Sequence, residues 1–172
     1  TGQDNRWIRP RNNYVRIYKN IKFIMIDTQL LDTQCTYIQE NMTNNMIKNY
    51  IYAFIEKELQ SDEKYKIVAG HAGIYGYGEH GNCYELEKKL LPLLLKYNTT
   101  LYLHGHEHLL QHNQIDNLNM FGCGSSSKIS KKEKMKYESK YIKKSFNEYG
   151  FCMHTIKNNS VINRFINKEG SI

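Results

Sequence analysis

The amino-acid sequence predicts a single α/β domain, and three observations lead to this prediction. Over residues 14–103, segments typical of strands alternate with segments typical of amphipathic helices, and most of the remaining chain has the pattern of β-structure. The 172 residues are enough for one domain, and neither an internal repeat nor a linker divides them. Apolar residues make up 40% of the chain and charged residues 24%, a composition typical of an ordered globular protein.

The strands of the first part differ in their patterns. Residues 14–18 alternate between polar and apolar side chains, which is typical of a half-buried strand. Residues 21–26 are almost continuously apolar, which predicts a strand buried on both faces. Residues 66–69 and 100–103 predict short strands, each followed closely by a glycine and a histidine. The later predicted strands are residues 109–115, 118–121, 150–156 and 161–166.

Two segments have the spacing of helices. In residues 44–59, apolar side chains recur at three- and four-residue intervals, as at Ile47, Ile51 and Ile55, and the opposite face is polar. Residues 86–97 show the same periodicity in leucines, and Pro92 predicts a kink because proline cannot donate a backbone hydrogen bond.

The net charge of +7 comes mostly from one segment. Residues 128–144 contain eight lysines and only two acidic residues, and we interpret them as a solvated loop. Attraction of phosphoprotein or nucleotide substrates is the alternative. An excess of positive charge that is confined to one segment does not predict a nucleic-acid partner. No apolar run reaches the ~18 residues of a membrane span, and the polar first residues do not resemble a signal peptide.

The four cysteines contain no C-x-x-C pair, which argues against a zinc ribbon and against a thioredoxin-like redox site. Their even number leaves two disulfides and four buried thiols open. Cys123 and Cys152 fall on strands predicted to be neighbours, and we interpret both as thiols in the core.

Five of the seven histidines lie between His71 and His108. His71 and His106 each follow a glycine close to the end of a predicted strand, where α/β folds bind ligands. The glycine lets the backbone turn sharply. His106 and His108 are two residues apart, so in an extended turn each could bind one of two adjacent metals. These three histidines predict a metal site, and the alternative is that they are ordinary surface side chains.

Several motifs together resemble the metallophosphoesterase (calcineurin-like) superfamily, and more narrowly the small, mammalian-type (tartrate-resistant) purple acid phosphatases. They are Val68-Ala69-Gly70-His71, His80-Gly81, Leu91-Pro92-Leu93-Leu94 with Tyr97, and Gly105-His106-Glu107-His108. Further matching features are Arg6-Trp7 with Pro10 and Tyr14, Asp27-Thr28, and the positions of Cys35 and Cys83. The similarity extends over almost the whole chain.

The resemblance implies a role for each histidine of the motifs. His71 and His106 correspond to the two imidazole ligands of the divalent metal, and His108 to the histidine that binds the ferric ion. His80 corresponds to the histidine that contacts the substrate phosphate and acts as general acid toward the leaving group. His104 corresponds to no ligand, so we expect a structural role.

The resemblance also implies features of the loop after His71 and of the cysteines. Gly73 stands where the family has proline, which predicts a looser loop there. Cys35 and Cys83 match the positions of a disulfide, which would stabilise the fold by roughly 4 kcal/mol.

The fold that the resemblance implies is a four-layer α/β/β/α sandwich, with the metals between its two sheets. Residues 1–172 match only the C-terminal half and supply three of seven protein ligands. The family's remaining ligands are an Asp, an Asp with a nearby Tyr, and an Asn followed by His, and no such motif precedes Arg6. We therefore expect the N-terminal half as a partner, in this or in another chain. Without it we expect residues 21–26 to be partly uncovered.

The function implied is an acid phosphatase that hydrolyses phosphate monoesters by means of a metal-bound hydroxide. Its dinuclear centre would combine Fe(III) with Fe(II), Zn(II) or Mn(II), held about 3.5–4 Å apart. The alternatives are another metallophosphoesterase, either a phosphodiesterase or a protein phosphatase, and a non-catalytic half-domain. We expect a secreted protein or one in an endomembrane or lysosome-like compartment, and an isolated chain that binds iron weakly and is inactive.

Overall fold

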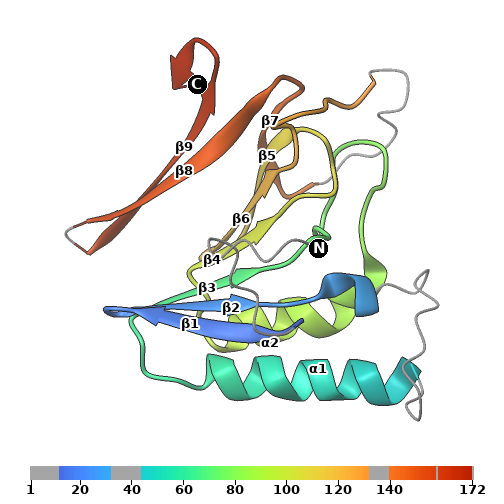
Figure 1. Ribbon diagram of the computed structural model, residues 1–172, viewed down its shortest axis with the longest axis vertical. Helices are drawn as coiled ribbons and strands as arrows, with labels where there is room; N and C mark the ends of the chain where they lie inside the picture. The colour runs from blue at the N-terminus through green and yellow to red at the C-terminus, as the bar shows by residue number, and fades with distance from the viewer. Residues whose placement is uncertain (1–11, 32–43, 132–139, 158, 172) are drawn as a thin grey trace, which may run out of the picture.

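A computed structural model describes residues 12–31, 44–131, 140–157 and 159–171 of the chain. These residues form two β-sheets, and the helices among them cover one face of the larger sheet (Figure 1). The α/β prediction is confirmed. Arg6, Trp7, Pro10 and Cys35 lie outside the described residues.

The larger sheet has seven strands in the order β1-β2-β3-β4-β6-β5-β7. Four neighbours in its centre, β2, β3, β4 and β6, run parallel. Strand β1 is antiparallel to β2, β5 is antiparallel to β6, and β7 is antiparallel to β5. The strands are β1 (Tyr14–Tyr18), β2 (Ile21–Met25), β3 (Tyr65–Ala69), β4 (Leu101–His104), β5 (Leu110–Ile115), β6 (Leu118–Cys123) and β7 (Ile142–Phe146). The carboxyl ends of the parallel strands therefore share one edge of the sheet.

The helices are α1 (Asn44–Leu59), which has the bounds predicted, a π-helical turn η2 (Leu86–Leu90) and α2 (Leu91–Lys96). A short 3-10 helix, η1 (Thr28–Leu30), follows β2. The leucine-rich segment is irregular before Pro92, because the N–H of Leu91 bonds to the carbonyl of Leu86, five residues back. The helices pack on the sheet through fully buried side chains such as Ile24, Ile51, Ile55 and Leu94.

The smaller sheet contains β8 (Gly150–Lys157), β9 (Ser160–Asn167) and β10 (Gly170–Ser171), in the order β10-β9-β8. It lies on the side of the large sheet away from the helices (Figure 1). A second core, which includes Ile67, Phe121 and Phe165, fills the space between the sheets. Strand β10 was not predicted, since its two residues carry no pattern.

Cys123 and Cys152 form a disulfide, so our interpretation of them as thiols is wrong. Cys123 ends β6 and Cys152 lies on β8, and their Cα atoms are 6.0 Å apart. Because the two strands belong to different sheets, the bond joins the sheets covalently. Strand prediction could place both cysteines near each other but could not supply this distance.

Two further predictions need correction. On β2 only one face is fully buried: Ile24 is inaccessible and Lys22 pairs with Glu58 at 2.9 Å, whereas Ile21 and Phe23 are half-buried. The lysine-rich segment is also not a loop throughout, because β7 begins at Ile142 and pairs with β5. No helix among the described residues is long and apolar enough to span a membrane.

Candidate metal centre

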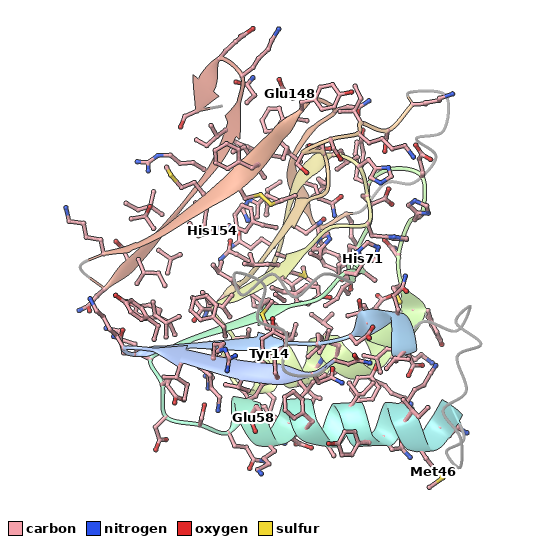
Figure 2. The ribbon with its side chains drawn as sticks, in the orientation of Figure 1. Tyr14, Met46, Glu58, His71, Glu148 and His154 are labelled. Carbon is pink, nitrogen blue, oxygen red and sulfur yellow. A yellow bond between two sulfur atoms is a disulfide. The ribbon has the colours of Figure 1, made fainter. Side chains whose placement is uncertain are left out.

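His71 lies just beyond the end of β3, at the edge of the large sheet (Figure 2). Gly70 is required before it, since a Cβ there would approach the Thr28 methyl group to 2.5 Å. The hydroxyl of buried Thr28 in turn accepts a hydrogen bond of 2.8 Å from the N–H of Ala72. The backbone directly after His71 is therefore held by Thr28, the first residue of η1, and Asp27 is the N-cap of this helix.

His106 reaches His71 because β3 and β4 are adjacent and parallel, with Ala69 opposite Leu103. The N–H of Gly105 donates to the carbonyl of His71 at 3.0 Å. His106 itself has a φ of +64°, a left-handed conformation that is uncommon for a residue with a side chain. This turn brings His106 Nδ1 to 3.2 Å from His71 Nε2.

The 3.2 Å distance between these nitrogens suits two ligands of one metal ion. Imidazole nitrogens bind zinc-like ions at about 2.0–2.1 Å, so two ligands at tetrahedral or octahedral angles lie roughly 2.9–3.4 Å apart. The two rings are steeply inclined, with centroids 5.0 Å apart and an interplanar angle of 70°. The distance between the two nitrogens is therefore compatible with two ligands of one metal ion.

His108 follows two residues later, in the segment between β4 and β5. Its backbone carbonyl accepts a hydrogen bond from the N–H of Ser130 at 2.8 Å. The ring nitrogen Nδ1 is buried and has no hydrogen-bond partner among the described residues. Buried polar atoms without partners are rare, and a metal ion would satisfy this one.

His80 lies in the glycine-rich loop between β3 and η2, and its side chain is exposed. Its ring lies against that of His106 in a tilted arrangement, with centroids 4.0 Å apart and planes inclined by 31°. The predicted general acid thus contacts a predicted ligand, although 26 residues separate them in the sequence. We call His71, His80, His106 and His108 the histidine edge.

Glu107 is the residue of this region that the sequence analysis missed. The residue is 2% exposed, and its carboxylate accepts hydrogen bonds of 2.9 Å from three consecutive N–H groups, those of Glu79, His80 and Gly81. Two features of the sequence could have drawn attention to Glu107: its place between two predicted metal ligands, and the presence of a glycine-rich loop elsewhere in the chain.

His104 is part of the packing, as expected. Its Nδ1 donates to the carbonyl of Gly105 and its Nε2 faces the Gln111 amide at 3.3 Å. Burial lowers the pKa of His104 to about 4, so the ring is neutral. The ring fills the space beside Gly73, where a Cβ would come within 2.6 Å of it. The position where the family has proline is thus occupied by a buried glycine packed against His104.

A second group of potential ligands lies between the two sheets. Cys123, Cys152 and His154 have ligand atoms within 4.8 Å of one another, a feature found only here in the part of the chain that the structure describes. The two sulfur atoms are joined in the disulfide, so neither is a thiolate that could bind a metal. The histidine edge is the better candidate.

Comparison with known proteins gives a consistent result. The family model described as calcineurin-like phosphoesterase matches residues 2–110. Purple acid phosphatase 3 of Arabidopsis thaliana is 33% identical over 142 residues, which cover 74% of this chain and 38% of that protein. Tartrate-resistant acid phosphatase type 5 of Sus scrofa is 33% identical over 145 residues, covering 80% of this chain and 41% of that protein.

A solved structure agrees in fold. GAP50, described as the anchor in the inner membrane complex of Plasmodium, superposes with a TM-score of 0.80 at 24% identity, over 95% of this chain and 53% of that one. The chain thus spans about two-fifths of the length of the curated relatives and about half of this structure.

Proposed function

The chain belongs to the calcineurin-like phosphoesterase family and has the metallophosphoesterase fold, and from this premise we propose that it forms part of an acid phosphatase acting on phosphate monoesters. The observation that carries the proposal is the 3.2 Å distance between ring nitrogens of His71 and His106 at the carboxyl ends of β3 and β4. Relatives named purple acid phosphatase and tartrate-resistant acid phosphatase favour the monoesterase over a phosphodiesterase or a protein phosphatase.

The histidine edge is proposed to hold a dinuclear metal centre. His71 and His106 would hold the divalent ion, Fe(II), Zn(II) or Mn(II), and His108 would hold Fe(III) through a ring that has a buried nitrogen without a partner. When bound, such a centre acidifies water and neutralises charge on the phosphoryl group. Imidazole suits each of these divalent ions, so these residues do not select among them.

The chain's own residues have separate tasks in this proposal. His80, exposed beside His106, would hydrogen-bond the substrate phosphate and donate a proton to the leaving oxygen. Histidine suits this task because its protonated form is available at acid pH. Thr28 would hold the backbone of the segment that carries His71 through its bond to Ala72.

A further protein segment is needed to complete the centre. The curated relatives are more than twice as long as the region they share with this chain. Hard oxygen ligands favour the ferric ion, and three histidines supply none. We propose that an N-terminal half provides the carboxylates, in one chain with these residues or as a tight complex, and that residues 1–172 alone bind iron weakly and are inactive.

The function is tested by metal analysis and hydrolysis of p-nitrophenyl phosphate, with residues 1–172 alone and with the complete protein. We expect two metals and turnover only in the complete protein, and loss of both metal and activity in His71→Ala. His112→Ala is the matched control, because His112 bonds to Asn119 on the large sheet, outside the histidine edge. A complete protein that binds metals but hydrolyses no phosphate ester would contradict the phosphatase proposal.

The second candidate is a non-catalytic role such as anchoring. We include it because GAP50, which has a similar fold, is described as an anchor. It predicts a complete protein without bound metal. For either candidate, we propose a secreted, endomembrane or lysosome-like location. The disulfide between Cys123 and Cys152 supports it, since disulfides persist in oxidising compartments.

A further inference from the structure

Glu107 is a buried carboxylate whose surroundings are unusual. It lies between His106 and His108 in the chain and is 2% exposed, yet no Lys or Arg among the described residues forms an ion pair with it. A buried charge is costly unless it is paired or hydrogen-bonded. Here the compensation comes from backbone: the N–H groups of residues 79–81 all point at the two carboxylate oxygens.

The loop is shaped around this carboxylate. A Cβ on Gly76 would lie 2.6 Å from Oε1 of Glu107, and a Cβ on Gly78 would lie 2.6 Å from Oε2. Both distances are shorter than atoms tolerate, so only glycine allows the loop to close here. Gly81 has a φ of +76°, which turns its N–H toward Oε1 while the chain leaves the loop. Successive N–H groups arranged in this way form an anion-binding nest.

Both oxygens of Glu107 are used in these bonds. Oε1 accepts from His80 and Gly81, and Oε2 accepts from Glu79. The carboxylate is therefore directed at the loop and is not presented as a metal ligand, although its neighbours on both sides are predicted ligands. Its backbone carbonyl is enclosed too, since a Cβ on Gly124 would contact it.

On the basis of the proposed function, we infer that Glu107 is a positioning residue that holds His80 against His106. His80 is exposed and contacts His106 through its ring, whereas its backbone N–H is bound by the carboxylate of the residue next to His106. One rigid unit thus carries a predicted metal ligand and the predicted proton donor. When the anchor is lost, the loop opens and His80 moves away from the leaving oxygen.

The first test measures the loop itself and needs neither metal nor catalysis. In the complete protein, Glu107→Gln keeps the size of the side chain but replaces an acceptor oxygen by a donor that opposes the loop N–H groups. We expect amide hydrogen exchange of residues 79–81 to accelerate by about tenfold to a hundredfold, the range for loss of a hydrogen bond to a charged acceptor. Unchanged protection of these amides would show that the Glu107 carboxylate does not hold the loop.

The matched control is Glu79→Gln, which removes a charge from the same loop but leaves the Glu107 carboxylate in place. Its side chain accepts a hydrogen bond of 3.2 Å from the N–H of Lys131. We expect exchange at residues 80 and 81 to stay as in the unmodified protein. Equal acceleration in both variants would show that the charge of the loop, and not the Glu107 anchor, controls it.

A second variant keeps the test decisive if Glu107→Gln does not fold. Gly78→Ala places a methyl group against Oε2 and disturbs the same contact from the side of the loop, without removing the buried charge. The same acceleration is expected at residues 79–81. Normal protection in Gly78→Ala would overturn the proposed close fit between loop and carboxylate.

The catalytic consequence is tested with metal-loaded complete protein. For Glu107→Gln we expect unchanged metal content, kcat lowered roughly tenfold or more for alkyl phosphates, and a smaller loss for p-nitrophenyl phosphate, whose leaving group needs less protonation. Loss of a metal would show instead that Glu107 is a ligand. The complete protein could prove inactive while amide hydrogen exchange of residues 79–81 still accelerates in Glu107→Gln. That result would contradict the proposed phosphatase function but support the inference that Glu107 holds the loop.

Discussion

The histidine edge and the helix-covered face of the same sheet are built in opposite ways. On the helix-covered face, Ile24, Ile51, Ile55 and Leu94 are completely buried and have no polar atoms to satisfy. The histidine edge combines an exposed His80, a left-handed His106 and a His108 ring with a buried nitrogen that lacks a partner among the described residues.

This contrast separates the region expected to carry stability from the region proposed to carry function. Strained backbone and unsatisfied polar atoms persist only when the surrounding structure enforces them. At the histidine edge the surrounding structure is the parallel sheet, because the pairing of β3 with β2 and β4 fixes the strand ends that precede His71 and His106. Substitutions on the helix-covered face should therefore reduce stability, and substitutions at the histidine edge should reduce activity.

The largest expected effect is at His80. His80→Ala should lower kcat of the complete protein on phosphomonoesters by ~10²–10⁴, the usual range for losing a general acid. The free energy of unfolding should change by less than about 0.5 kcal/mol, since the side chain is exposed. Kinetics with alkyl phosphates and p-nitrophenyl phosphate measure the first quantity, and urea denaturation the second. An equal loss on all esters would mean that His80 only binds phosphate.

The opposite result is expected on the helix-covered face. Ile55→Ala should lower the free energy of unfolding by about 2–5 kcal/mol, because it empties part of a closely packed core. The activity per folded molecule should be unchanged. Tyr50→Ala on the same helix is the control, since Tyr50 is 62% exposed and should contribute little. Reduced activity per folded molecule in Ile55→Ala would contradict the expectation that the helix-covered face affects stability alone.

The next largest effect is expected for the disulfide, which should contribute to the free energy of unfolding. It closes a loop with a sequence separation of 29, and the chain-entropy model gives roughly 3–4 kcal/mol for a loop of this size. The variant with Cys123→Ala and Cys152→Ala should show this loss in urea denaturation of oxidised protein. An undiminished free energy of unfolding would show that noncovalent packing between the two sheets suffices.

The smallest expected effect concerns pH and His104. The pKa of its buried ring is about 4 in the folded protein and 6.5 when unfolded, so between these values only the unfolded chain takes up the proton. Stability should be complete above pH 6.5 and decrease by up to about 3 kcal/mol as the pH falls to 4. His104→Gln should flatten this part of the curve of unfolding free energy against pH. The same slope in the variant would assign the effect to other groups.

Burial also lowers the pKa of His112, and its contribution has the same sign. His112→Gln therefore serves as the comparison, and it should remove a smaller part of the slope than His104→Gln.

Local patterns predicted much of the fold. The periodicity of residues 44–59 predicted α1 with its observed bounds, because one helix face must meet the sheet. The glycine–histidine pairs marked the ends of β3 and β4, where the structure brings His71 and His106 together. Strand β7 was missed because its lysines dominate the sequence pattern, and only its pairing with β5 makes it a strand.

Local periodicity and side-chain type were enough to predict the α/β class and the positions of most strands, and to select histidines as candidate metal ligands. The disulfide, the burial of His104 and the three hydrogen bonds to the Glu107 carboxylate became visible only in three dimensions. Each depends on distances between segments far apart in the chain. The N–H groups that bind the Glu107 carboxylate lie 26 to 28 residues before it, and no local pattern records their approach.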